Sequence, residues 1–203
     1  MRVVIASHNR GKLLEFSALL APLGLELSEP GGLGIPAPDE TRTTFIENAL
    51  DKARYVARES GLPALADDSG LIVPALGGAP GIRSARFAGD QASDAENNAR
   101  LIDQLSHLDQ PEAHYYCALV FMRTHHDPAP VIATGIWQGV IIAEPRGSHG
   151  FGYDPHFLVP EFDQTAAELA PARKNRLSHR ARALADLIAG LRQAGDLPTR
   201  RRP

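Results

Sequence analysis

The strongest constraint on the fold is a strand, a polar loop and a helix that follow one another at the start of the chain. Residues 2–6 (RVVIA) form a short apolar run rich in β-branched side chains, which is typical of a buried strand. After the polar segment 7–12 (SHNRGK), Leu13, Phe16 and Leu20 recur at helical spacing. This order predicts an α/β architecture, in which helices cover a sheet.

The rest of the chain continues the alternation of helices and strands. Two capping-box pairs, Thr44 with Glu47 and Ser93 with Glu96, predict the starts of two helices. Further strands are expected at residues 115–122, 131–142 and 156–159, and a last helix from Ser178 to Gly195. The pattern favours one α/β domain over residues 1–203 with a mixed sheet.

Charge and cysteine content restrict partners and compartment. The net charge of -3 argues against a general nucleic-acid binder, so a polyanionic ligand needs locally placed positive charge. The single cysteine, Cys117, cannot form an internal disulfide, which favours a reducing compartment. Because we find neither a bilayer-spanning segment nor a signal-peptide pattern, we expect a cytoplasmic protein without a membrane partner.

The loop between the first strand and the first helix is the first candidate site. It consists of Ser7, His8, Asn9, Arg10, Gly11 and Lys12. A helix N-terminus presents unpaired N–H groups and a partial positive charge, Lys12 adds a full charge, and Gly11 permits close backbone approach. The spacing of a Walker P-loop is absent, so phosphate binding and an ordinary polar turn both remain open.

The second candidate site is Asp67-Asp68-Ser69-Gly70, which interrupts an apolar strand. Successive side chains of an extended chain point to opposite faces, so only one of the two carboxylates can enter a given site. One interpretation is a Mg²⁺ ligand and a base for water, with Glu40 as the second carboxylate, because Mg²⁺ takes one or two protein carboxylates. The alternative is a solvated turn, for which these residue types are well suited.

The third candidate is the loop 150–155 (GFGYDP). Its glycines flank Phe151, so that the ring can be presented to a flat ligand, and Asp154 can accept a hydrogen bond from a base edge. The alternative is that Phe151 anchors the loop to the core.

The fourth candidate is a cluster of cations at the start of the last helix. Lys174 precedes the expected helix, and His179 and Arg180 occupy its first turn, where the helix dipole disfavours cations. These cations are therefore expected to donate hydrogen bonds to acceptor atoms of a ligand. Alternatively, Arg180 pairs with a carboxylate such as Glu168 and only steadies the helix.

These motifs, taken together and in this order, resemble the inosine/xanthosine triphosphate pyrophosphatase family. The resemblance runs from near the first residue to the last helix. The matching stretches are Ser7, Asn9 and Lys12, ETRTTFIENA (40–49), ADDSGL (66–71), GGAPGIRSARFAG (77–89), GFGYDPHF (150–157), Lys174 and SHR (178–180).

The resemblance implies an elongated α/β fold with a cleft between two lobes, a homodimer, and Mg²⁺-dependent hydrolysis of ITP, dITP and XTP to the monophosphate and pyrophosphate. It assigns residues 7–12 to the triphosphate, Asp68 to general-base catalysis, and Asp68 with Glu40 to the metal. It assigns the remaining residues to substrate binding, with Phe151 stacking on the purine: Ser69, Phe151, Gly152, Tyr153, Asp154, Lys174, His179 and Arg180.

One residue departs from the family pattern, and two other classes of function remain open. His8 stands where such enzymes commonly carry a small residue, so its side chain is expected to point away from the phosphates. The rival classes are a phosphohydrolase that removes only the terminal phosphate and a nucleotide sensor without catalysis.

Overall fold

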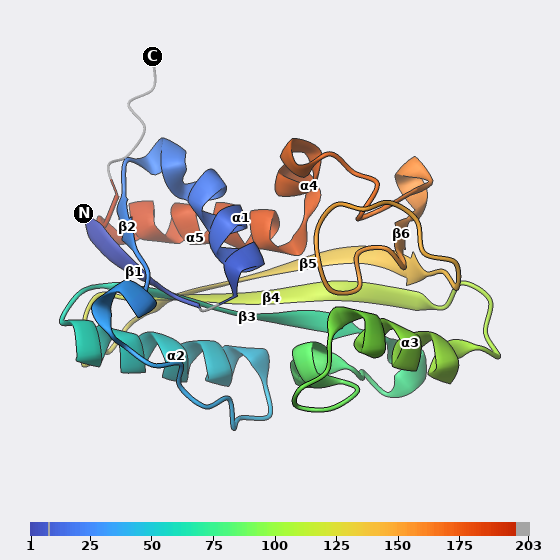
Figure 1. Ribbon diagram of the computed structural model, residues 1–203. Coiled ribbons are helices and arrows are strands. Elements are labelled where there is room, and N and C mark those ends of the chain that lie inside the picture. The colour runs from blue at the N-terminus through green and yellow to red at the C-terminus, as the bar shows by residue number, and fades with distance from the viewer. Residues whose placement is uncertain (8, 198–203) are drawn as a thin grey trace, which may run out of the picture. The chain divides into compact units, whose positions relative to one another are not determined.

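A computed structural model describes residues 1–7 and 9–197 of the protein (Figure 1). The strands are β1 (Arg2–Ala6), β2 (Glu26–Ser28), β3 (Ala64–Ile72), β4 (Glu112–Met122), β5 (Val131–Ile141), β6 (Phe157–Val159) and β7 (Gln164–Thr165). The α-helices are α1 (Arg10–Leu20), α2 (Phe45–Ser60), α3 (Asp94–Leu105), α4 (Pro171–Leu177) and α5 (His179–Ala194). Short 3₁₀ turns connect several of these elements.

The strands of the described residues form one seven-stranded sheet in the order β2-β1-β3-β4-β5-β6-β7. β1 pairs in parallel with β2 and β3, whereas β6 pairs antiparallel with β5 and β7. The sheet is therefore mixed, and the predicted α/β class is confirmed.

The chain forms two compact units, which correspond to the two lobes that the resemblance implies. Unit 1 contains the described residues of Met1–Asp68, Cys117–Gly135 and Arg180–Pro203, and unit 2 contains Ser69–Tyr116 and Ile136–His179. β3, β4 and β5 contribute residues to both units. A single domain over residues 1–203 and a cleft between the lobes stay predictions.

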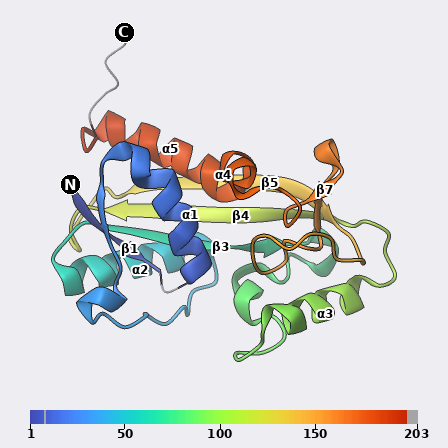
Figure 2. The same ribbon diagram turned by 45° about the horizontal axis from the view of Figure 1, so that its top comes forward.

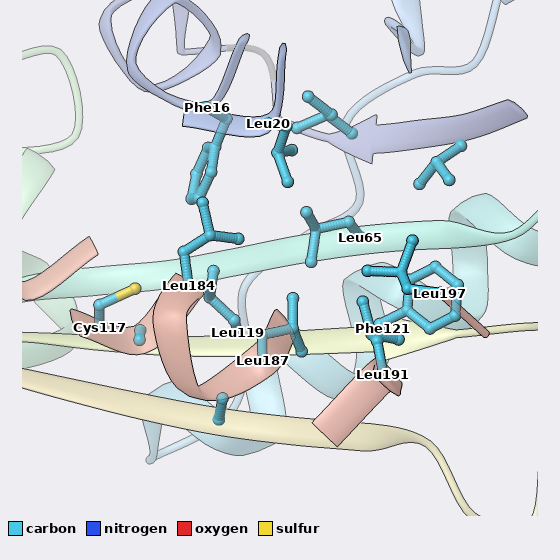
Figure 3. Packing of buried hydrophobic residues seen from close by; sticks show 14 of the residues in the cluster. Phe16, Leu20, Leu65, Cys117, Leu119, Phe121, Leu184, Leu187, Leu191 and Leu197 are labelled. Atoms are coloured by element: carbon cyan, nitrogen blue, oxygen red, sulfur yellow. The ribbon is translucent and has the colours of Figure 1, made fainter. Parts of the chain in front are cut away.

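Unit 1 is a three-layer arrangement. α1 and α5 cover one face of its strands, and α2 covers the opposite face (Figures 1 and 2). An apolar cluster lies between the strands and the helices α1 and α5, and it includes Phe16, Leu65, Leu119 and Leu187 (Figure 3). Leu65 of β3 belongs to this cluster, so Asp67, two residues further along the strand, also faces α1 and α5.

Unit 2 buries its largest aromatic side chains together. Trp137 is 2% exposed and packs with Tyr115 and Phe157. Leu101 of α3 belongs to the same apolar cluster. Across the described part of the chain, no helix has the length and hydropathy that a membrane crossing requires.

The predicted helix starts are confirmed by their capping bonds. Thr44 accepts a hydrogen bond from the Glu47 N–H at 3.2 Å, and Ser93 with Glu96 forms a complete capping box at the start of α3. α5 begins directly after Ser178, as expected.

Three elements were not predicted from the sequence, namely the short strands β2 and β7 and the helix α4. β2 has three residues and no apolar alternation of its own, and it is extended because it pairs with β1. α4 is a short helix with Pro171 in its first turn, and it places Lys174 inside a helix instead of before one.

Candidate active site

β3 is a continuous strand that contains the two adjacent carboxylates Asp67 and Asp68. The predicted interruption at Asp67-Asp68-Ser69-Gly70 is wrong, because the strand is continuous from Ala64 to Ile72. The solvated turn is also wrong, since Asp67 and Asp68 are 2% and 4% exposed. The expectation that the two side chains face opposite sides is confirmed by their partners, which come from different helices. Charged partners on each face of the strand outweigh the turn preference of these residues.

Asp67 faces α1 and α5 in unit 1. Its Oδ2 lies 2.5 Å from Lys12 Nζ, and its Oδ1 accepts a hydrogen bond from Cys117 Sγ at 3.1 Å. Burial alone would raise the pKa of Asp67, but the positive charges of Lys12 and Arg180 outweigh burial and hold that pKa well below its usual range. Asp67 therefore stays ionised and fixes the lysine of the predicted phosphate loop.

Arg180 belongs to the same buried network. Its Nη1 donates to Glu15 Oε2 of α1 at 2.9 Å, and its Nε lies 3.9 Å from Asp67 Oδ1. The carboxylate partners of this arginine thus include Glu15, whereas Glu168 lies 3.3 Å from Arg146. Burial lowers the pKa of Arg180, and the charges of Asp67 and Glu15 more than reverse this effect. The sequence offered no signal for Glu15, because the pair joins two helices far apart in the chain.

Asp68 faces α2, where a lysine joins it to Glu40. Lys52 Nζ donates to Glu40 Oε1 at 2.7 Å and to Asp68 Oδ1 at 3.3 Å, while Asn48 Nδ2 donates to Asp68 Oδ2 at 3.1 Å. The two predicted metal carboxylates therefore converge on one nitrogen. Asn48 and Lys52 were not predicted as site residues. They could have been found in the sequence as two polar residues that lie one helical turn apart on the otherwise apolar, buried face of α2.

The charge balance on this face is negative. The pKa of Asp68 is raised, chiefly by burial. The positive charge of Lys52 lowers this pKa, and the negative charge of the neighbouring Glu40 raises it further. Two carboxylates and one ammonium leave a net negative charge in a largely buried place. No cluster of three or more His, Cys, Asp or Glu suited to a metal occurs among the residues that the structure describes. Two converging carboxylates nevertheless fit Mg²⁺, which commonly takes only one or two carboxylates and completes its shell with phosphate oxygens and water.

The predicted phosphate loop begins beside Asp67. β1 and β3 are parallel with Ala6 opposite Ala66, so the chain leaves β1 at the level of the carboxylates. Asn9 caps α1 by accepting from the Lys12 N–H at 3.1 Å, and the Ser7 hydroxyl accepts from the Asn9 N–H at 3.2 Å. Arg10 begins α1, and Gly11 lies in its first turn. His8 lies outside the described residues, so the expected orientation of its side chain stays a prediction.

In unit 2, Asp154 is the centre of the hydrogen bonds around the predicted base site. Its Oδ2 accepts from Lys174 Nζ at 2.5 Å and from the Phe151 N–H at 3.0 Å. Its Oδ1 accepts from the Tyr115 hydroxyl at 3.1 Å. Because both oxygens are engaged and Asp154 is buried, its observed contacts position Lys174 and the loop. A Cβ at Gly150, where φ is +77°, would collide with this carboxylate, which explains the glycine.

The aromatic and cationic residues of unit 2 lie around this carboxylate. Phe151 is half-buried, and Lys174 Nζ is 5.1 Å from the centre of its ring. The ring of His179 stacks on Tyr115 with centroids 4.7 Å apart and planes 12° apart. Tyr115 was missed because it reads as an ordinary strand residue.

The remaining predicted substrate residues also belong to unit 2. Ser69 is half-buried in β3, directly after Asp68 in the chain. Tyr153 is buried and donates its hydroxyl hydrogen to the Ser84 carbonyl oxygen at 2.8 Å, and burial raises the pKa of that hydroxyl. Gly152 adopts a φ of +62°, in the left-handed region.

Comparison with known proteins agrees with this fold. Residues 3–190 match the Ham1 family, and the chain belongs to that family. It is 58% identical over 194 residues to a dITP/XTP pyrophosphatase of Ralstonia nicotianae, covering 94% of this chain and 96% of that protein. It is 52% identical over 197 residues to a dITP/XTP pyrophosphatase of Nitrosomonas europaea, covering 97% of each.

A solved structure shares the fold along nearly the whole chain. The structure of a HAM1 protein from Coxiella burnetii matches with a TM-score of 0.88 and 45% sequence identity, covering 95% of this chain and 99% of that one. The family resemblance read from the motifs is thus confirmed.

Proposed function

We propose that the protein hydrolyses non-standard purine nucleoside triphosphates, namely ITP, dITP and XTP, to the nucleoside monophosphate and pyrophosphate. The observation that carries the proposal is the convergence of Asp68 and Glu40 on the ammonium of Lys52, with Lys12 on the other face of the same strand. A base for water and positive charge for phosphates are the two requirements of polyphosphate hydrolysis. The names of the relatives support the same reaction.

Asp68 is the proposed general base. Its raised pKa makes it a stronger proton acceptor than an ordinary aspartate, while Lys52 and Asn48 keep its carboxylate oriented. Asp68 removes a proton from a water molecule whose oxygen bonds to the α-phosphorus. The bond from that phosphorus to the bridging oxygen breaks, and pyrophosphate leaves with the electron pair.

The phosphate chain needs compensation of its negative charge. We propose that Asp68 and Glu40 hold Mg²⁺, which when bound offsets charge on the phosphates. Lys12 and Lys52 add positive charge, and Asp67 holds Lys12 in place. Ser7, Asn9 and the backbone N–H groups at the start of α1 supply neutral partners.

The base is recognised by ring stacking and by donors to its keto group. Phe151 stacks on the purine, and Lys174, His179 and Arg180 supply donors, while Asp154 positions Lys174. A six-keto purine accepts such a hydrogen bond, whereas adenine presents an amino group and leaves the donor unpaired. Each unpaired buried group costs about 1–3 kcal/mol, which discriminates against ATP.

One assay tests the proposal. The purified protein is incubated with ITP, XTP, dITP, ATP and GTP, with Mg²⁺ or with EDTA, and pyrophosphate and orthophosphate are measured separately. We expect Mg²⁺-dependent pyrophosphate release with ITP, XTP and dITP far above ATP. Orthophosphate as the product would identify a terminal phosphohydrolase, and binding without turnover would identify a sensor. A homodimer and a cytoplasmic location stay predictions; light scattering after gel filtration tests the former.

A further inference from the structure

Helix α3 holds the loop that carries Phe151 through contacts that the proposed reaction does not use. In unit 2, the Gly152 N–H donates to Asp94 Oδ2 at 2.7 Å, and the Gly152 carbonyl oxygen accepts from Asn98 Nδ2 at 2.9 Å. Asp94 and Asn98 are one helical turn apart, so they lie on the same face of α3. One helix therefore fixes both backbone polar groups of the residue that follows Phe151.

The loop is also fixed on both sides of Gly152. The Phe151 N–H donates to Asp154 at 3.0 Å, and the Tyr153 hydroxyl donates to the Ser84 carbonyl oxygen at 2.8 Å. Glycine is the most flexible residue, and Phe151 stands between two of them. Without external bonds such a loop would sample many ring orientations, and ordering it on binding would reduce affinity.

We propose that Asp94 and Asn98 are specificity-determining positioning residues, which preset the Phe151 ring for the purine by holding the backbone of Gly152. The inference rests on the proposed function, in which the purine stacks on Phe151. Within the described residues, the side-chain hydrogen bonds of Asp94 and Asn98 reach Gly152 of this loop and none of the residues proposed to bind phosphate. Their loss should therefore weaken recognition of the base and leave recognition of the phosphate chain intact.

Two substitutions remove the two bonds separately. Asp94→Ala deletes the acceptor for the Gly152 N–H. Asn98→Asp keeps the shape of the side chain but turns a carboxylate oxygen toward the Gly152 carbonyl oxygen, so the donor is lost. Each variant should raise KM for ITP about three- to tenfold, which corresponds to the loss of one ordinary hydrogen bond, and should leave kcat nearly unchanged.

Matched controls separate positioning from a general loss of stability. Asp94→Asn keeps an oxygen that can accept from Gly152 while removing the charge, so it should restore a KM near the wild-type value. Asp103→Ala removes the same charge from an exposed position of α3 and should leave KM unchanged. Inorganic tripolyphosphate, a competitor that has no base, should inhibit all variants with the wild-type Ki.

The outcomes are distinguishable. A raised KM for ITP with an unchanged tripolyphosphate Ki, rescued by Asp94→Asn, supports the inference. A Ki that rises together with KM, an Asp94→Asn variant as impaired as Asp94→Ala, or a wild-type KM in both loop variants overturns it. Absence of pyrophosphate release by the wild-type protein would instead overturn the proposed function. Should Asp94→Ala fail to fold, Asn98→Asp alone decides, because its melting temperature and KM are measured on the same sample.

Discussion

The two adjacent aspartates of β3 allow a matched pair of substitutions, Asp67→Asn and Asp68→Asn. Both replace a buried carboxylate by an amide of equal shape, on neighbouring residues of one strand. We expect opposite consequences: Asp67→Asn should lower stability, whereas Asp68→Asn should abolish most turnover and leave stability equal or higher. The difference follows from the partners on the two faces.

The magnitude for Asp67 comes from its ion pairs. Removing one member of a buried pair costs about 3–5 kcal/mol, because the other charge is left uncompensated. Lys12 keeps 15% of its side chain exposed and Arg180 keeps Glu15, so we expect the lower end, about 3 kcal/mol. For a chain of this length, about 2–4 °C per kcal/mol gives a fall in melting temperature of roughly 6–12 °C.

The ionised form of Asp68 is instead disfavoured in the folded protein, first by burial and also by Glu40. An amide removes that cost, so the melting temperature should not fall. Loss of a general base lowers the rate by about 10²–10⁴, and loss of a metal ligand adds to this. Pyrophosphate release from ITP with saturating Mg²⁺ measures the effect.

The pH dependence of stability, measured in EDTA, should have opposite signs for the two residues. The folded pKa of Asp67 is lowered, so its contribution is present above its ordinary value and is lost as pH falls through the folded pKa. The folded pKa of Asp68 is raised, so its contribution is present below the ordinary value of 3.8 and is lost as pH rises through the folded pKa. Thermal melts of both variants beside the wild type check this.

Either of two results would refute this reasoning. If Asp68→Asn keeps wild-type turnover with Mg²⁺, the general-base assignment is wrong. If Asp67→Asn melts at the wild-type temperature near neutral pH, the Lys12 and Arg180 pairs do not carry the stability that their geometry indicates.

Three further substitutions test individual cations. Lys12→Ala should raise KM by about 10- to 100-fold for ITP, XTP and ATP alike, because the phosphates are the only part of the substrate that Lys12 is proposed to contact; a loss confined to one base contradicts this. Arg180→Ala should lower kcat/KM for ITP about 10- to 100-fold and for ATP much less. If the variant instead melts at a lower temperature and keeps the wild-type ratio of kcat/KM for ITP to that for ATP, Arg180 has only a structural role in its pair with Glu15. Lys52→Met should enlarge the rise in melting temperature caused by Mg²⁺, since the ammonium competes for the same carboxylates; thermal titration with MgCl₂ measures this, and a smaller rise than in wild type contradicts it.

Much of the local structure could be read from the sequence. The strand at residues 2–6, the capped starts of α2 and α3, and the start of α5 were predicted because capping and periodicity depend on residues within a few positions of one another. The opposite orientation of Asp67 and Asp68 followed from the alternation of side chains along a strand. The order of the motifs was enough to indicate the family.

Tertiary structure alone decided the conformation of residues 67–70 and the partners of the charged groups. Asp-Asp-Ser-Gly has the composition of a turn, yet it is extended because β3 is hydrogen-bonded between β1 and β4 and cations meet each carboxylate. The roles of Lys52 as partner of Asp68 and of Glu15 as partner of Arg180 depend on the packing of α2 and α1 against opposite faces of that strand. An ion pair forms wherever packing brings two charges together, and the short-range patterns of a sequence do not record which helix covers which face of a sheet.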